Sequence, residues 1–398
     1  MHAAARGVSV AHIDELADRP ESADRGQVVV RSIASAEQSR RVLLSWPGVN
    51  PMQLNDAIGV AIQGAGTVST EHLKAYLVNP GCRVVAVGSR TKEGAAAKAR
   101  EVGLDPSGIG LYDDVHALLS HPGLDAVSIC TPSARHAQET IAAARAGQHV
   151  LIEKPVATTQ GDLSAMGQAV REANVRTVVG FVLRWNPMVM AIKAMLAQGL
   201  IGQPLLVGAD YWHNAEQSGY PGASNRLKRA TDSAMVSAGC HAVDMARYLM
   251  GCDVVQVTAV EASALPGLPA PANQVAIVRF ANGMAGRISA CTEQWMPYQF
   301  NVDLLGTDGG IRDNRFYSRR IPGMLDWGSF PTVTPNSGLV SHHPFRAEID
   351  HFLECVRTGV ESHVNLRDAI NTHEVCFAID QSARDNGRPI SLPLSSSA

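Results

Sequence analysis

Two side chains that can exchange protons stand where they could act on a hydroxyl group. Lys154 follows a short apolar run, and His241 precedes Asp244 by three residues, so these two would share one face of a helix. A lysine at the carboxyl end of a parallel strand can donate to a substrate oxygen, and histidine is the usual proton shuttle near neutral pH. On the residues alone, Lys154 could equally be a surface lysine paired with Glu153, and His241 a buried histidine at a helix start.

A glycine-rich turn lies upstream of these residues. The sequence Gly64-Ala65-Gly66-Thr67-Val68-Ser69 directly follows an apolar run that begins at Ala57, and it opens a predicted helix. Glycines there allow a tight turn and let the backbone approach a pyrophosphate at the helix N-terminus. Ser69 replaces the third glycine of the usual fingerprint and is small enough to pack in its place. The turn favours dinucleotide binding over an ordinary strand-to-helix connection.

The residues that would select the cofactor's ribose follow the second predicted strand. That strand ends in Gly88-Ser89-Arg90-Thr91, without the acid that binds the 2′-hydroxyl of NAD. Ser89 and Arg90 could instead bind a 2′-phosphate. The segment therefore favours NADP over NAD, although Arg90 could also be a solvated surface arginine.

The elements expected around these motifs form two domains. Apolar runs alternate with helical patterns up to residue 178, which predicts an α/β Rossmann domain over residues 56–178. Longer strands follow, with a hairpin signal at Asn282-Gly283 and two amphipathic helices over residues 345–385. These predict an α+β domain with a large, mainly antiparallel open sheet over residues 179–398. Residues 1–55 are predicted to be a disordered leader, and a chain beginning at Met52 is expected to fold and function normally.

Bulk composition narrows the partners. The 398 residues carry a formal charge of −3, which does not favour nucleic acid or an anionic membrane, and no apolar run is long enough to span a bilayer. The 7 cysteines are scattered without a C-x-x-C pair, as is typical of reduced thiols in a cytoplasmic protein. His342, His343 and His351 lack partners at ligand spacing, so no metal site is predicted.

Several motifs together resemble those of the Gfo/Idh/MocA family, which includes glucose–fructose oxidoreductases and inositol dehydrogenases. The family's order is followed by the turn at Gly64, by Cys130-Thr131-Pro132 with His136, and by Glu153-Lys154-Pro155. It is followed further by Arg184-Trp185-Asn186-Pro187, by Gly239 to Asp244, and by His343-Pro344-Phe345. The resemblance implies substrate bound between the second domain and the nicotinamide, and a homo-oligomer, dimer or tetramer, formed through the open sheet.

The resemblance also assigns roles to residues. It makes Lys154 and His241 catalytic, and it suggests that Pro155 follows a cis peptide bond. Ser237 and Asp244 would contact substrate. The cofactor would be bound by Gly64, Gly66, Thr67, Val68, Ser89, Arg90, Cys130, Thr131, Pro132, His136, Glu153, Lys154 and Arg184.

One position departs from the family pattern. Four residues before the histidine the family often has an aspartate, whereas this chain has Ser237. A serine cannot hold a negative charge beside the histidine, so the third catalytic role passes to Ser237 itself, to Asp232 or to Lys228, and the sequence does not choose among them.

The function expected from the resemblance is an NAD(P)-dependent oxidoreductase that moves hydride between nicotinamide and a secondary alcohol or ketone of a sugar, inositol or glycoside. One alternative is a lyase or hydrolase that retains its cofactor and uses transient oxidation. The other is a dinucleotide-binding sensor without catalysis, which the serine at position 237 would favour.

Overall fold

The structure, a computed structural model, describes residues 57–214, 228, 231–263, 265–336 and 339–394. The leader predicted over residues 1–55, including the possible start at Met52, lies outside these ranges. In the first predicted domain the described part begins at Ala57, just before the strand that leads into the glycine turn.

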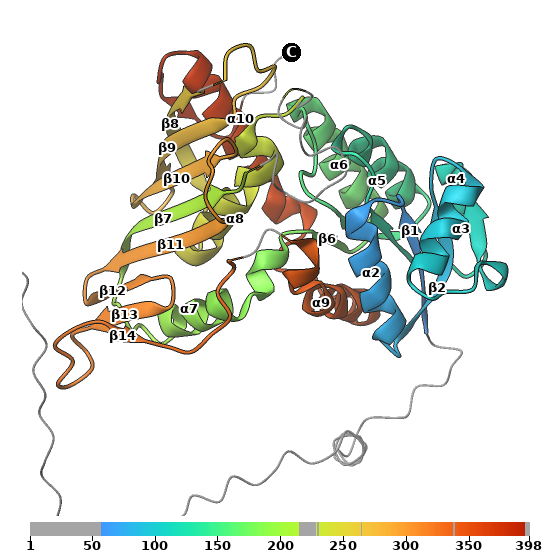
Figure 1. The fold of residues 1–398 in the computed structure, drawn as a ribbon, viewed down its shortest axis with the longest axis horizontal. Coiled ribbons are helices and arrows are strands. Elements are labelled where there is room, and N and C mark those ends of the chain that lie inside the picture. The colour runs from blue at the N-terminus through green and yellow to red at the C-terminus, as the bar shows by residue number, and fades with distance from the viewer. Residues whose placement is uncertain (1–56, 215–227, 229–230, 264, 337–338, 395–398) are drawn as a thin grey trace, which may run out of the picture. The chain divides into compact units, whose positions relative to one another are not determined.

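Six parallel strands form the first sheet, in the order β3-β2-β1-β4-β5-β6 (Figure 1). The order reverses on either side of β1, which creates the point where open α/β sheets bind ligands beyond the carboxyl ends of their strands. Every residue of β1 is buried, as expected for a strand covered by helices on both faces. The strands are β1 (Ile58–Gln63), β2 (Cys82–Gly88), β3 (Gly110–Tyr112), β4 (Ala126–Ile129), β5 (His149–Ile152) and β6 (Thr177–Val179).

Helices connect these strands, and several begin at a side-chain cap. Thr91, Asp114 and Thr159 each accept a hydrogen bond from a backbone N–H in the first turn of the following helix, which satisfies groups that the helix itself leaves free. The helices are α2 (Thr67–Val78), α3 (Lys92–Glu101), α4 (Val115–Leu119), α5 (His136–Arg145) and α6 (Gln160–Ala173). The predicted alternation of strands and helices is confirmed.

A nine-stranded sheet dominates the second part of the chain, in the order β14-β13-β12-β11-β7-β10-β9-β8-β15. All its pairs are antiparallel except β7 with β10. The predicted hairpin is present: β9 and β10 pair antiparallel, and Gly283, with φ +84°, lies in the turn between them. The strands are β7 (Pro204–Trp212), β8 (Val254–Ala262), β9 (Asn273–Phe280), β10 (Ala285–Cys291), β11 (Gln299–Gly306), β12 (Gly309–Arg312), β13 (Arg315–Ser318), β14 (Gly328–Ser329) and β15 (Ile390–Ser391).

Four α-helices follow β6 along the described part of the chain: α7 (Pro187–Ala197), α8 (Cys240–Met250), α9 (Phe345–Thr358) and α10 (Leu366–Arg384). Helix α8 packs on β7 and β10, and α10 packs on β8, so both cover the same side of the sheet (Figure 1). A single π-helical turn, Met235–Gly239, leads directly into α8. Such turns occur often at functional sites.

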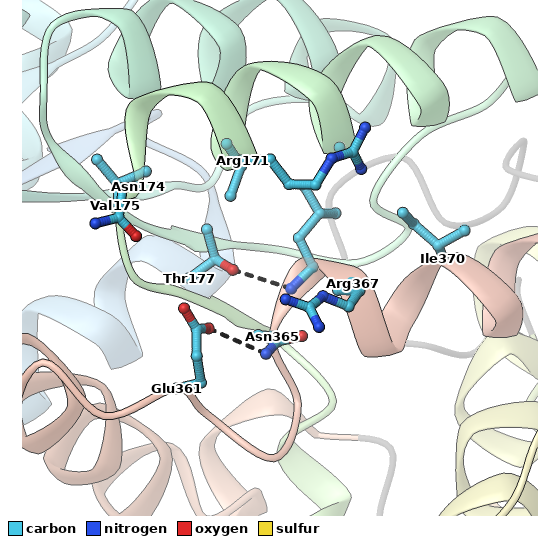
Figure 2. Close-up of a pocket in the computed structure, with 11 residues that line it drawn as sticks. Arg171, Asn174, Val175, Thr177, Glu361, Asn365, Arg367 and Ile370 are labelled. Atoms are coloured by element: carbon cyan, nitrogen blue, oxygen red, sulfur yellow. Dashed lines mark hydrogen bonds between the residues drawn. The ribbon is translucent and has the colours of Figure 1, made fainter.

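The C-terminal helices return to the first sheet. Helix α9 packs on α2, and the start of α10 is fastened to β6 because Leu366 donates its backbone N–H to Thr177 Oγ1 at 2.9 Å. Figure 2 shows this bond beside a groove of about 130 Å³ between α6 and α10, which lies away from the glycine turn. The predicted boundary between residues 178 and 179 falls inside β6, and the two sheets share their C-terminal helices.

Two further sequence expectations concern membranes and cysteines. In the described ranges, no helix combines the length and apolar character needed to cross a membrane. All seven cysteines carry free thiols.

Candidate active site

The glycine turn has the geometry that a dinucleotide requires. Gly64 has φ +111°, and a Cβ there would lie 2.6 Å from the Cys130 backbone, so only glycine fits. Gly66 caps α2 without a side-chain hydrogen bond, and no acid occupies the first turn, which leaves the helix N-terminus available to an anion. Ser69 is fully buried and donates to Gly66 O at 2.7 Å, the packing position predicted for it.

A crevice of about 550 Å³ opens over this turn at the carboxyl ends of β1, β2 and β4. Its walls bring together two segments predicted to hold cofactor, Ser89-Arg90 and Cys130-Thr131-Pro132. Sequence reasoning missed Gln63 and Arg135, which also line it. The glycine cradle, the open helix N-terminus and this volume fit a dinucleotide. The full lining is Gln63, Gly64, Ala65, Gly66, Ser89, Arg90, Cys130, Thr131, Pro132 and Arg135.

A buried carboxylate organises the wall of the crevice. Glu139 is 0% exposed and accepts from Gln63 Nε2 at 3.0 Å, from Thr131 Oγ1 at 2.5 Å and from Arg135 Nε at 2.9 Å. These bonds fix the side chains that face the cofactor crevice. The sequence gives one signal for this role, a glutamate three residues after His136 on the same helix face.

Lys154 stands on a rigid turn at the end of β5. The Lys154–Pro155 peptide bond is cis, as the family motif suggested. Glu153 accepts the Lys154 backbone N–H at 3.1 Å and lies 3.0 Å from His72 Nε2, so its side chain is turned away from the crevice. His136 is also structural: its Nδ1 lies 2.8 Å from Pro155 O and its Nε2 2.7 Å from Thr131 O. The structure thus places Glu153 and His136 beneath the predicted cofactor site, where they hold its loops.

Lys154 contacts the turn that leads to His241. Lys154 Nζ donates to the backbone oxygen of Ser237 at 3.3 Å, in the π-helical turn that delivers His241. The His241 ring stacks on Tyr211 at 5.4 Å and is only 5% exposed. Burial, then the charges of Lys154 and His343, lower the pKa of His241 well below its usual value. Its Nδ1 has no hydrogen-bond partner among the described residues.

A second histidine, His343, faces the same lysine. It precedes α9, and its ring lies 6.5 Å from that of Tyr298. Burial, then the charge of Lys154, lower the pKa of His343 to about 4. Sequence reasoning treated His343 only as a loop histidine within a motif, because nothing local indicates that the segment before α9 returns to Lys154.

The candidates for the third catalytic role are placed as follows. The Ser237 hydroxyl donates back to Ser233 O at 2.8 Å, so its backbone carbonyl, not its side chain, holds Lys154. Asp232 accepts from Ser133 Oγ at 3.2 Å, and burial raises its pKa. Lys228 is exposed.

Arg184 and Asp244 are not in the crevice. Sequence reasoning expected Arg184 to face the cofactor and Asp244 to contact substrate, yet both are almost fully buried and bound to each other. Arg184 Nε and Nη2 donate to the two Asp244 oxygens at 2.9 and 2.6 Å, and Nη2 also donates to Asp368 at 2.6 Å. A buried guanidinium requires such counter-charges, so Arg184, Asp244 and Asp368 form one ion-pair network.

Two protein-family models match consecutive parts of the chain. Residues 58–181 match the oxidoreductase family with an NAD-binding Rossmann fold, and residues 189–312 match the GFO/IDH/MocA C-terminal domain. The chain is 28% identical to scyllo-inositol 2-dehydrogenase (NAD(+)) of Bacillus subtilis, across 83% of this chain and 95% of that protein. It is 27% identical to D-apiose dehydrogenase of Paraburkholderia graminis, across 83% and 89% of the two chains.

Solved structures show the same architecture. Levoglucosan dehydrogenase in complex with NADH superposes with a TM-score of 0.74 and 24% identity, across 85% of this chain and 99% of that one. Both sheets and the glycine turn therefore belong to a known fold, and both family matches fall on it. The chain belongs to the Gfo/Idh/MocA family of oxidoreductases.

Proposed function

We propose that this protein transfers hydride between a nicotinamide dinucleotide and a secondary alcohol or ketone of a sugar-like substrate. The observation that carries the proposal is the meeting of Lys154 with the turn that delivers His241, next to the dinucleotide crevice. The relatives' names, which specify inositol, apiose and levoglucosan dehydrogenases, support a polyol or sugar as the substrate class.

The residues divide the proton chemistry between them. When bound, the nicotinamide accepts or supplies the hydride. The Lys154 amine lies where it can donate to the reacting oxygen and stabilise charge that develops on it. His241 is neutral at neutral pH because burial and Lys154 lower its pKa, so its imidazole can accept the hydroxyl proton. The Ser237 backbone carbonyl accepts a hydrogen bond from Lys154 and so orients its amine.

The direct test is turnover. Purified protein is mixed with inositols, free sugars and glycosides, with NAD and NADP separately, and reduced nicotinamide is followed by absorbance. Net reduction with one class establishes the dehydrogenase. Consumption of a glycoside without net reduction would instead support the retained-cofactor lyase, and binding of cofactor without any conversion would support the sensor.

We further propose that the ribose end of the crevice favours NADP. Ser89 and Arg90, which follow β2, line the crevice, and no acid is among its lining residues. A charge-assisted hydrogen bond contributes about 1.5–3 kcal/mol, so Arg90→Ala should raise the KM for NADP roughly 10- to 100-fold and leave that for NAD within about twofold. Ser89→Asp, which supplies an acid for the 2′-hydroxyl, should move preference toward NAD. Steady-state kinetics with both cofactors measures this, and equal responses of the two KM values to Arg90→Ala would refute it.

We propose a homo-oligomer that uses the outer face of the nine-stranded sheet. On β9, Val275 and Ile277 point away from the core and are 45% and 57% exposed, where an alternating strand facing water would be polar. Val260 on β8 pairs with Val275 and is 61% exposed, so the apolar surface is continuous. Helices α8 and α10 cover the other face, which leaves this one suited to a second copy of the chain.

A single charged substitution on the exposed face of β9 tests the oligomer prediction. Ile277→Lys should convert the assembly to a smaller species in analytical ultracentrifugation, because a buried lysine at the interface would lack a partner. Arg279→Lys, on the same strand and face, serves as the matched control and should leave the sedimentation unchanged. A wild-type chain that sediments as a monomer would overturn the proposal.

A further inference from the structure

A group of buried titratable side chains lies beneath the turn that carries Lys154. Glu348 on α9 and His72 on α2 are both 0% exposed, and Glu153 at the end of β5 is 6% exposed. One carboxylate oxygen of each glutamate and a ring nitrogen of His72 lie within 4.8 Å of one another. Three elements distant in sequence therefore meet through two carboxyl groups that are removed from water.

Glu153 has the donors that an ionised carboxylate needs. The Lys154 backbone N–H donates to one oxygen, and His72 Nε2 lies 3.0 Å from the other. On the opposite side of the ring, His72 Nδ1 lies 3.7 Å from Cys130 Sγ, and burial raises the pKa of that thiol, so it is protonated and can donate to Nδ1. His72 then donates from Nε2. Burial opposes ionisation of Glu153, but the His72 hydrogen bond and the Lys154 charge lower its pKa.

Glu348 has the opposite surroundings. Neither of its oxygens has a hydrogen-bond donor within the described part of the chain. Burial, then the negative charge of Glu153, raise its pKa well above the usual value. The other titratable groups near it are His72, with a ring nitrogen within 4.8 Å, and Tyr76 and Cys130, which burial keeps neutral by raising both pKa values. Glu153 is therefore the ionised group that Glu348 faces.

We propose that Glu348 is a neutral carboxylic acid whose O–H donates to the Glu153 carboxylate, so that the two groups hold one proton between them. The shared proton gives the Glu153 carboxylate one more hydrogen bond to accept. It also removes the unpaired charge that Glu348 would otherwise carry. It fastens α9 directly to the turn that positions Lys154.

The bond makes Glu348 a positioning residue for the site. Phe345, one turn earlier on α9, packs its ring 5.3 Å from His72 and 6.3 Å from His343, so the start of α9 places His343 near Lys154. A Cβ on Gly180 would lie 3.1 Å from the Glu153 carboxyl atoms, which shows how closely that carboxylate is enclosed. Loss of the proton would therefore separate α9 from both catalytic elements. This consequence rests on the proposed role of Lys154, whereas the shared proton does not.

The test compares full-length wild type with Glu348→Gln by urea denaturation from pH 5 to pH 9. The glutamine amide donates as the acid does, but it cannot ionise. Because the folded pKa of Glu348 is raised, its contribution to stability is complete below the unfolded pKa and is lost as pH rises toward the folded pKa. The wild-type folding constant should therefore fall up to about tenfold per pH unit relative to that of Glu348→Gln, or about 100-fold between pH 6 and pH 8.

Infrared difference spectroscopy supplies an independent signature. Wild type at pH 7 should show the carbonyl band of a buried protonated carboxyl group, and Glu348→Gln should lack it. Glu139→Gln is the matched control: Glu139 is as deeply buried but already accepts from three donors, so this variant should keep the band and lose stability. Glu348→Ala should lower kcat more than Glu348→Gln does.

Three results would overturn the proposal. Parallel pH dependence of stability in wild type and Glu348→Gln would mean that Glu348 does not change protonation on folding. A carboxyl band that persists in Glu348→Gln would assign the proton elsewhere. One divalent metal per chain in elemental analysis, with stability lost on chelation, would make the cluster of His72, Glu153 and Glu348 a cation site.

Discussion

Replacement of Lys154 by alanine is expected to lower kcat by about 10²–10⁴-fold, the range by which a positioned proton donor accelerates a reaction. Its Nζ is held by the Ser237 carbonyl, on the turn that leads to His241. The dinucleotide crevice is not lined by Lys154, and cofactor affinity should change little. Stopped-flow reduction of nicotinamide gives the rate, and fluorescence titration gives the dissociation constant.

The controls separate charge, geometry and folding. Lys154→Arg keeps the cation but not the compact ammonium, and it should recover at most a small part of the rate. Lys74→Met removes a lysine that is exposed on α2 and paired with Glu71, and its kcat should equal that of wild type. A Lys154→Ala protein with unchanged kcat would show that the proton leaves through another group, and the catalytic assignment would fail.

Local sequence patterns were sufficient to predict most of the fold. An apolar run ending in glycine predicted β1 and its turn, and Asn282-Gly283 predicted the hairpin. Each of these features depends on residues close together in the chain, where backbone preferences and side-chain periodicity act directly. The family resemblance assigned Gly64, Ser89 and the Cys130-Thr131-Pro132 loop to the cofactor, and they line one crevice because parallel strands present their carboxyl ends on one edge.

The contacts that sequence patterns did not predict join distant segments. His343 and Glu348 come from the C-terminal part of the chain, yet they reach the turn that bears Lys154. A helix pattern identifies a buried face but not the element that it packs against, so Glu348 reads only as a residue of an amphipathic helix. The ion pairs of Arg184 were not predicted for the same reason: its motif suggested the cofactor, and its counter-charges lie far along the chain at Asp244 and Asp368.

The largest effect on stability is expected from the buried network of Arg184, Asp244 and Asp368. Asp244→Ala would leave the Arg184 guanidinium buried with one of its two carboxylate partners missing. Burial lowers the pKa of Arg184, but Asp244 and Asp368 raise it above its usual value. A guanidinium does not deprotonate in proteins, so the side chain stays charged when Asp244 is removed. Removing one partner of a buried pair costs about 3–5 kcal/mol, and urea denaturation should show a loss of that size. Asp244→Asn, which retains an acceptor, should lose less.

An exposed ion pair provides the comparison that isolates burial as the cause. Asp385 pairs with Arg388 at the C-terminal end of α10, with side chains 37% and 61% exposed, and Asp385→Ala should cost at most about 1 kcal/mol because water replaces the lost contact. If Asp244 touched substrate, as its place after His241 suggested, Asp244→Ala would raise KM with little loss of stability. A stability loss with unchanged KM in the remaining folded protein assigns it instead to the buried network. That network then explains why this part of the family motif carries an arginine and an aspartate: they fix helix α8, and with it His241, against the turn that follows β6.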